Sequence, residues 1–275
     1  MQVDAPAPAA RRSAVSKSPN SLNSLNSPTS RTRIAAYQIA LVASILLLWE
    51  LAVRWKFAPV YLYGQPSGVI AKASTLISSG ELWNHTKYTA FEAILGFLVG
   101  TSLGSLAGLL LWLSDTAAKV LRPIIVAING VPKIALAPLI IVWFGIGVEA
   151  KVAIAASLTF IVALIAVYQG TQEIDGELVR LMRSLGAKRF QIWQKVVVPG
   201  TVPWILSAMR LNIGFAMIGA VVGEYISSKQ GLGFFIYNAG ALYDLNAVLV
   251  GIFALMVLAL LLDAALNFIE RKFRW

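Results

Sequence analysis

The sequence predicts an all-α, polytopic integral membrane protein with six transmembrane helices and a short basic hairpin outside the bilayer. Hydrophobic residues make up 58% of the 275 residues, and the mean hydropathy is +0.73. Both values exceed what a soluble domain usually carries, so the lipid bilayer is the expected solvent. Apolar stretches of about 20 residues, the length that crosses the hydrocarbon core as a helix, recur roughly six times.

The first 33 residues differ in composition from the rest of the chain. They contain "APAPAA" and "SLNSLNS" and no apolar run, which predicts a disordered tail outside the fold. Arg11 and Arg12 form a twin-arginine pair, but no apolar region follows directly and no A-x-A pattern follows Val53, so we expect no cleaved export signal. The first span is therefore expected from Ile34 to Val53, and the six-helix domain over residues 34–275.

Five further apolar stretches complete the set of expected spans. They cover residues 90–113, 122–147, 151–170, 202–226 and 246–268. Pro132 and Pro138 interrupt the second of these five, which predicts a kinked or broken helix because proline removes a backbone hydrogen bond. Residues 64–88 show a weak 3.6-residue periodicity, which predicts a short interfacial helix between the first two spans.

The lysines and arginines outside the spans are distributed unevenly. Six spans place both termini on one side, together with the basic residues Arg11, Arg12, Lys17, Arg31, Arg33, Lys119, Arg122, Arg180, Arg183, Lys188, Arg189, Lys195, Arg271, Lys272 and Arg274. The other side holds only Arg54, Lys56, Lys72, Lys87, Lys151 and Lys229. The positive-inside rule therefore predicts cytoplasmic termini, and it accounts for the formal net charge of +10 without a nucleic-acid partner.

Glycines recur every four residues in the second span, at Gly96, Gly100, Gly104 and Gly108. This spacing puts four positions without side chains on one helix face, which lets another backbone approach closely. The partner is either a second helix of the same chain or a second copy of the chain.

The residues that usually carry catalysis or bind metals are scarce. The chain has no cysteine and a single histidine, His85, so we expect neither a metal centre nor a serine-type triad. No G-x-x-x-x-G-K-[ST] motif is present, so the chain has no phosphate cradle of that type and cannot be its own ATPase. We therefore expect no enzyme activity and no bound cofactor in this chain.

A basic amphipathic segment, "SLGAKRFQIWQKVVVPGTVP" at residues 184–203, lies between two spans. Apolar residues form one face before Gly186 and another after it: Leu178, Leu181, Met182 and Leu185, then Phe190, Ile192, Trp193, Val196 and Val197. This pattern predicts two short helices that meet at the glycine, with apolar faces toward the membrane helices and cationic faces elsewhere. The charge pattern alone fits an interfacial helix on anionic lipid equally well.

The spacing of Gly186, Trp193, Val196, Pro199 and Pro203 resembles the cytoplasmic "EAA" motif of ATP-binding-cassette (ABC) importer permeases. The segments "VPKIALAPLIIVWFGIG" and "MRLNIGFAMIGAVVGEYISSKQGLGFFI" are similar to the third and fifth membrane regions of the nitrate, sulfonate and taurine branch of these permeases. The resemblance runs from about residue 66 to the C-terminus.

One departure from the motif is clear. Arg180, Leu181 and Met182 occupy the positions of its Glu-Ala-Ala, and Glu177 lies one turn earlier, where it is a candidate for the missing carboxylate.

The resemblance implies a type I, binding-protein-dependent ABC importer in a bacterial inner membrane. Such permeases form homodimers and receive a small solute, here an oxyanion such as nitrate, a sulfonate or taurine, from a periplasmic or lipid-anchored solute-binding protein. They dock cytoplasmic ATPase subunits, which bind the ATP, through a coupling helix. The resemblance places this coupling segment at about residues 173–200, with the site residues Glu177, Arg180, Leu181, Met182, Leu185, Gly186, Ala187, Phe190, Trp193, Pro199 and Pro203.

The alternative is a secondary transporter or channel driven by an ion gradient, with the basic segment as a lipid anchor. Inverted repeats and acidic residues deep in the helices would favour it. We find no convincing repeat, and we expect the acids Glu50, Glu92, Glu224 and Asp263 to lie near helix ends. A membrane enzyme is disfavoured because no nucleophile, base and metal set converges.

Two cations fall inside expected spans, Lys133 and Arg210. A charge at that depth requires a partner or a wet cavity, so both are candidates for an anion translocation pathway. Alternatively, Arg210 extends to the interface and Lys133 pairs with a carboxylate or carbonyls of a neighbouring helix. The loop around residues 228–243, with "KQGLGFF", is expected outside, either touching a binding protein or as a plain turn with glycine caps.

Overall fold

The computed structural model describes the backbone of residues 28–273, and this part of the chain forms helices without any strand. The predicted tail covers residues 1–33. Its first 27 residues, including Arg11 and Arg12, lie outside the described residues. The first helix, α1 (Pro28–Arg54), begins six residues before the expected start of the first span.

Within residues 28–273, five continuous helices are long and apolar enough to cross a membrane. They are α1, α4 (Glu81–Leu111), α7 (Val148–Gln172), α10 (Val198–Ser227) and α12 (Leu245–Phe273). A sixth candidate for a crossing is α5 (Asp115–Gly130) followed by the 3₁₀ turn η2 (Lys133–Leu136) and α6 (Ala137–Phe144). The two parts meet at an angle of 89°, as in a broken span or a re-entrant loop. The all-α polytopic fold is thus confirmed, and so is the break in the helix expected over residues 122–147.

The shorter helices are α2 (Val60–Tyr63), α3 (Pro66–Ser78), α8 (Gly176–Ser184), α9 (Arg189–Ile192), the π turn η3 (Trp193–Val197) and α11 (Leu232–Ala241). The expected short helix between the first two spans is α3, but the second span starts at Glu81, nine residues earlier than predicted. Gly80, with φ of 76°, makes the turn between them.

The expectation of a loop over residues 228–243 was wrong for most of its length, because α11 occupies it. Leu232, Phe235, Ile236 and Ala239 recur at helical spacing, and all four side chains are buried. They pack in two apolar clusters with residues of α3, α4, α10 and α12. The apolar face therefore drives helix formation in a segment whose glycines suggested a turn.

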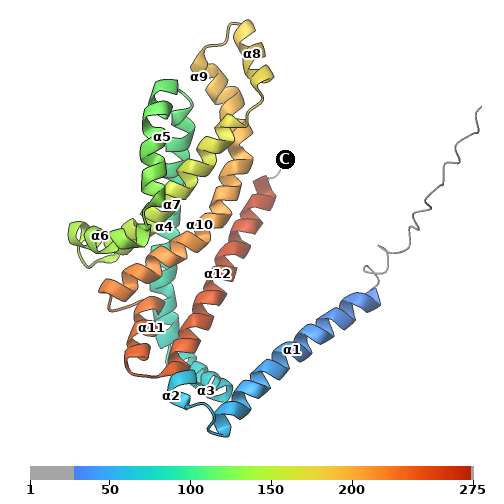
Figure 1. The fold of residues 1–275 in the computed structure, drawn as a ribbon, viewed down its shortest axis with the longest axis vertical. Coiled ribbons are helices and arrows are strands. Elements are labelled where there is room, and N and C mark those ends of the chain that lie inside the picture. The colour runs from blue at the N-terminus through green and yellow to red at the C-terminus, as the bar shows by residue number, and fades with distance from the viewer. Residues whose placement is uncertain (1–27, 274–275) are drawn as a thin grey trace, which may run out of the picture.

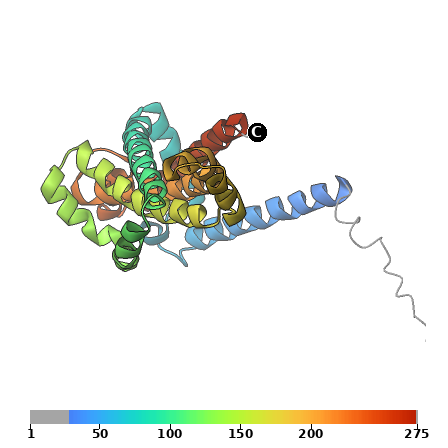
Figure 2. The same cartoon turned by 90° about the horizontal axis from the view of Figure 1, so that it is seen from above.

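Helices α4, α7 and α10 run side by side through the centre of the molecule, and α12 packs along them (Figure 1). We call the end that carries α8 and α9 the hairpin end, and the opposite end, with α2, α3 and α11, the α11 end (Figure 1). Helix α1 extends away from the other helices in both views (Figure 2). Near its C-terminus, Glu50 accepts hydrogen bonds from Ser67 N (3.0 Å) and Ser67 Oγ (2.8 Å).

The glycine seam of α4 packs against α7 of the same chain. A Cβ atom built on Gly96 would lie 2.3 Å from Ala155 Cβ, and one on Gly100 would lie 2.0 Å from Thr159 Oγ1. At Gly104 and Gly108 the nearest atoms are backbone oxygens of α7. The sequence left open whether this glycine face packs against a helix of the same chain or against a second copy. The structure shows that it packs against a helix of the same chain.

Helix α7 is held equally closely by α10 on another face. A Cβ on Gly219 would lie 2.4 Å from Ala155 Cα, so Ala155 is enclosed between two glycine surfaces. A buried amide adds a polar tie, since Asn212 Nδ2 donates to Thr101 Oγ1 of α4 (2.9 Å) and to Thr159 O of α7 (3.0 Å). Small residues and a shared polar group are the usual means by which helices associate in lipid.

Candidate functional site

Helix α8 and the turn that follows it form the tip of the hairpin end. Asp175 caps the helix by accepting a hydrogen bond from Glu177 N (2.8 Å). At the other end, Gly186 N donates to Arg183 O (2.9 Å) and Ala187 N donates to Met182 O (3.0 Å). This pair of bonds is a Schellman motif, in which the residue after the helix adopts a left-handed conformation.

Gly186 is that residue, with φ of +80°. The left-handed conformation costs an L-residue with a side chain about 1–2 kcal/mol. No other part of the chain approaches this position closely, because no atom lies within 4 Å of a Cβ built on Gly186. Backbone conformation, rather than space within this chain, explains the glycine.

The second half of the hairpin is a continuation of a membrane helix. Helical backbone runs without a break from Arg189 to Ser227, so the prediction of two short helices was right for α8 and wrong for α9. The π turn η3 joins α9 to α10, and Val198 N donates to Trp193 O. Pro199, in the first turn of α10, has no N–H to donate to the carbonyl four residues earlier, which accounts for the irregular turn before it. Pro203 lies inside α10.

Arg189 fastens the hairpin to the turn between α4 and α5. Its guanidinium donates to both carboxylate oxygens of Asp115 (3.2 and 2.9 Å) and to Trp112 O (2.8 Å). The guanidinium also lies over the Trp112 ring, 5.4 Å from its centre. A guanidinium that donates to both oxygens of a carboxylate fixes the relative orientation of the two groups as well as their separation.

Trp193 makes the second attachment of the hairpin. Its Nε1 donates to Leu109 O, near the end of α4, at 2.9 Å. Its ring stacks on Phe190 with 5.4 Å between centres. Sequence reasoning identified Trp193 and Phe190 but missed Asp115, Trp112 and Leu109, since nothing in a single sequence pairs residues more than seventy positions apart.

The apolar face of α8 is exposed. Leu181 is 55% and Leu185 73% accessible, and Leu178 and Phe190 are exposed as well. We expected this face to point toward the membrane helices, and for α8 that was wrong. Only the face after Gly186 packs inward, where Ile192 and Val197 are buried. A group of large apolar side chains at the tip of a basic hairpin is the kind of surface that binds another protein or a membrane.

The remaining predicted residues of this segment lie on the surface of α8 or beside it. Glu177 and Arg180 form an exposed ion pair one turn apart (3.7 Å), and Met182 and Ala187 are half-buried. Glu177 therefore stands in the first turn of α8, at a helix N-terminus that favours a carboxylate.

The two cations of the expected spans bind different partners. Lys133 stands at the bend between α5 and α6, and its Nζ donates to Asn129 Oδ1 (3.1 Å). Arg210 of α10 forms a forked pair with Glu270 of α12, with Nε to the two carboxylate oxygens at 3.2 and 3.1 Å. Glu270 is buried, and the sequence analysis did not identify it.

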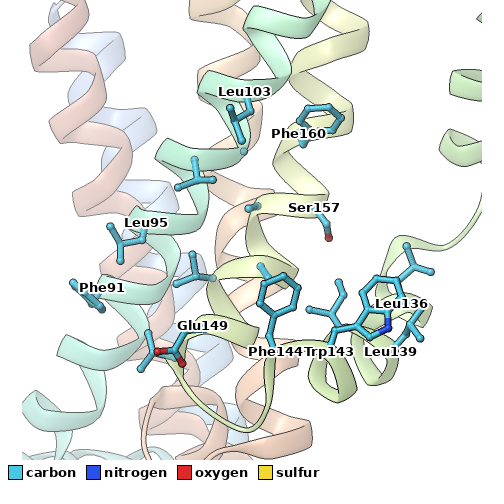
Figure 3. Close-up of a pocket in the computed structure, with 17 residues that line it drawn as sticks. Phe91, Leu95, Leu103, Leu136, Leu139, Trp143, Phe144, Glu149, Ser157 and Phe160 are labelled. Carbon is cyan, nitrogen blue, oxygen red and sulfur yellow. The ribbon is translucent and has the colours of Figure 1, made fainter. Parts of the chain in front are cut away.

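A cavity of about 950 Å³ lies between α4, α6 and α7 (Figure 3). Apolar side chains such as Phe91, Leu95, Trp143, Phe144 and Phe160 line it, and Glu149 and Ser157 are its polar members. None of the lining residues is basic. The cavity therefore offers no counter-ion to an anionic solute.

Two of the acids expected near helix ends are buried. Glu224 does lie close to the end of α10, but Glu92 lies eleven residues inside α4 because that helix starts at Glu81. Lys151 of α7 is buried with them. Within residues 28–273, no group of three His, Cys, Asp or Glu side chains could hold a metal ion.

Comparison with known proteins agrees with this architecture. The chain is 33% identical over 236 residues to the putative aliphatic sulfonates transport permease protein SsuC of Escherichia coli (strain K12), covering 86% of this chain and 90% of that protein. It is 32% identical to the riboflavin transport system permease protein RibX of Chloroflexus aurantiacus, over 84% of this chain and 87% of that protein.

The fold is also similar to a solved structure. The inward-facing MetNI methionine ABC transporter matches with a TM-score of 0.61 at 21% identity, over 70% of this chain and 95% of that chain. Residues 100–275 match the family described as the binding-protein-dependent transport system inner membrane component. The chain thus belongs to this family of multi-pass inner-membrane permeases of ABC transporters.

Proposed function

We propose that the chain imports a small solute as the permease subunit of a type I ABC importer, and that α8 and its turn are the docking element for a cytoplasmic ATPase subunit. The observation that carries this proposal is the exposed apolar face of α8, with Leu181 and Leu185, on a hairpin that is fixed to the membrane helices. A lipid anchor would need no such attachment.

The attachments give the hairpin a way to transmit motion. The pair between Arg189 and Asp115 links it to the start of α5, and the Trp193 hydrogen bond links it to α4. Helix α9 continues directly into α10. A displacement of α8 by a partner would therefore act on α4, α5 and α10 together, and these helices also hold α7.

We infer the orientation from the charge distribution. The hairpin end carries Arg180, Arg183, Lys188, Arg189 and Lys195, and the positive-inside rule supports a cytoplasmic position for it. The α11 end then faces the solute-binding protein on the other side of the membrane. A second copy of the permease and membrane lipid complete the assembly that the family resemblance implies.

The solute is proposed to be a small organic or inorganic oxyanion such as a sulfonate, taurine or nitrate. Support comes from the 33% identity to a permease named for aliphatic sulfonates. The riboflavin permease at 32% identity is the second candidate class. Competition between unlabelled sulfonate and riboflavin for uptake by the reconstituted complex distinguishes the two.

If Arg210 and Lys133 line an anion pathway, neutralising them lowers transport while the complex still assembles. Arg210→Gln alone would leave Glu270 buried without its partner, so Arg210→Gln with Glu270→Gln is the informative variant. Lys133→Gln tests the second cation, and Arg33→Gln, at an exposed position of α1 away from the other helices, is its control. We expect solute uptake to fall severalfold in the first two and to stay normal in the control. Normal uptake in all three would remove both cations from the pathway.

Copurification tests the proposed function against a gradient-driven transporter. Native permease isolated from its membrane is expected to bring a chain with a G-x-x-x-x-G-K-[ST] motif, and uptake in vesicles is expected to require ATP. Uptake by the permease alone, driven by an ion gradient, would refute the proposal.

A further inference from the structure

Three ionisable side chains meet inside the bundle near the α11 end. Glu92 comes from α4, Lys151 from α7 and Glu224 from α10, and the three are only 2%, 3% and 0% accessible. Charges buried in the low-dielectric interior must be compensated locally. The cluster takes no part in the hairpin described above.

Glu224 binds the turn that leads into α11. Its Oε1 accepts from Thr89 Oγ1 (2.7 Å), and its Oε2 accepts from Gly233 N (2.6 Å) in the first turn of α11. A Cβ built on Gly231 would lie 2.1 Å from this carboxylate, and one on Gly233 2.7 Å. The two glycines of "GLG" therefore make room for the carboxylate of Glu224.

Thr89 extends this contact between α4 and the turn. Its Oγ1 also accepts a hydrogen bond from Leu232 N (2.7 Å), while His85 Nδ1 accepts from Gly231 N (3.1 Å). Two consecutive backbone N–H groups of the turn, those of Gly231 and Leu232, are thus held by α4, and the next one, that of Gly233, is held by Glu224.

Lys151 supplies the positive charge of the cluster. Its Nζ donates to Ser227 O (2.6 Å) at the end of α10, to Gly147 O (3.1 Å) and to Ile146 O. Three carbonyls around one ammonium group account for all of its donors. The single positive charge balances one carboxylate and no more.

Glu92 is the carboxyl group whose charge Lys151 does not compensate. It lies one turn after Thr89 on α4, beside the surface that binds Glu224, and its buried Oε2 has no hydrogen-bond partner within the part of the chain that the structure describes. Two buried carboxylates on facing helix surfaces repel each other, so with one ammonium group only one of the two is ionised and the other carries a proton. With one proton the cluster is neutral: one ammonium, one carboxylate and one carboxylic acid.

We propose that Glu92 and Glu224 form a buried site that binds one proton, and that the protonated pair latches the turn between α10 and α11 onto α4. Loss of the proton would place a second negative charge in the cluster and weaken the carboxylate's hold on the turn. The proton site does not depend on the proposed function. Only the placement of the latch at the external face rests on it.

Other ionisable groups face the cluster, and the experiment must separate them. His85 lies on α4 with Glu81 near it, Glu149 lies on α7, and Tyr225 lies on α10. Helix α11 contributes only backbone amides among the described contacts. Histidine ordinarily titrates near pH 6.5, so its effect appears on acidification, whereas the proton of the pair is lost on alkalinisation.

Infrared spectroscopy of the purified permease detects the proton directly. The wild type is expected to show the carbonyl band of a protonated carboxylic acid at neutral pH, and Glu92→Gln is expected to lose it because the amide replaces the acid. The exposed Glu149→Gln should retain the band. Absence of the band in the wild type, or its persistence in Glu92→Gln, would overturn the proton site.

Thiol labelling tests the latch, since the chain has no cysteine of its own. Cysteine at Leu232, which is buried in the turn, is expected to react faster as pH rises, beyond the increase for cysteine at the exposed Gln230. The Gln230 variant corrects for the reactivity of the thiol itself. Adding Glu92→Gln should remove the excess at Leu232. An equal pH dependence at the two positions in the wild-type background would overturn the latch.

Discussion

Replacing Gly100 by leucine is expected to abolish accumulation of the folded permease in the membrane. A Cβ at this position would lie 2.0 Å from Thr159 Oγ1 and 2.3 Å from the backbone oxygen of Ala156. The oxygen belongs to the backbone of α7, which is held on its other face by Gly219 of α10. Helix α7 therefore has no room to move away, and overpacking of this kind costs about 1–3 kcal/mol or more.

The measurement is the amount of monodisperse permease recovered in detergent, with its melting temperature. Gly100→Ala should give an intermediate loss, because its single added carbon meets the same two atoms. Gly214→Leu is the matched control, since nothing lies within 4 Å of a Cβ there and the residue is exposed on α10. If Gly100→Leu accumulates as well as Gly214→Leu, the seam between α4 and α7 is not the packing that holds this bundle.

Gly186→Val is expected to eliminate the stimulation of ATP hydrolysis by loaded solute-binding protein in the reconstituted complex. Valine is β-branched and resists the φ of +80° that closes the Schellman motif after α8. The chain must then leave α8 in another direction. The exposed face with Leu181 and Leu185 would therefore no longer have the orientation that the ATPase subunit binds. The membrane helices should remain folded, because no side chain or backbone of those helices lies within 4 Å of a Cβ built on Gly186.

Gly176→Val is the control within the same hairpin, because this glycine has neither a positive φ nor a close neighbour. The isolated ATPase subunit should keep its basal rate in all cases. Stimulation that survives in Gly186→Val, with normal copurification of the ATPase, would show that the turn does not position α8 for coupling.

Much of the membrane topology follows from one-dimensional patterns. Runs of apolar residues locate the spans, and Pro132 and Pro138 locate the break between α5 and α6, because hydrophobicity and missing N–H groups act locally. The glycine period in α4 likewise predicts a close helix contact. The identity of its partner, α7, depends on three-dimensional packing that the period does not contain.

The candidate site shows the same division. The positions of Gly186 and of the apolar residues of α8 were predicted by spacing, whereas the direction of that apolar face depended on where the tip projects. Asp115 could not be matched to Arg189, nor Glu270 to Arg210, because a single sequence does not show which distant charged residues pair in the fold. Glu92 was assigned to a helix end only because the start of α4 was placed nine residues too late.

The central claim is that the exposed face of α8 contacts an ATPase subunit, and a single-cysteine cross-link tests it most directly. The chain has no cysteine, so Leu181→Cys on α8 and Tyr243→Cys at the α11 end each introduce a unique thiol on an exposed position. With a photoactivatable thiol reagent, the Leu181 variant is expected to cross-link to a chain that carries the phosphate-binding motif, and the Tyr243 variant is not. Cross-linking of the Leu181 variant to lipid alone would contradict the account.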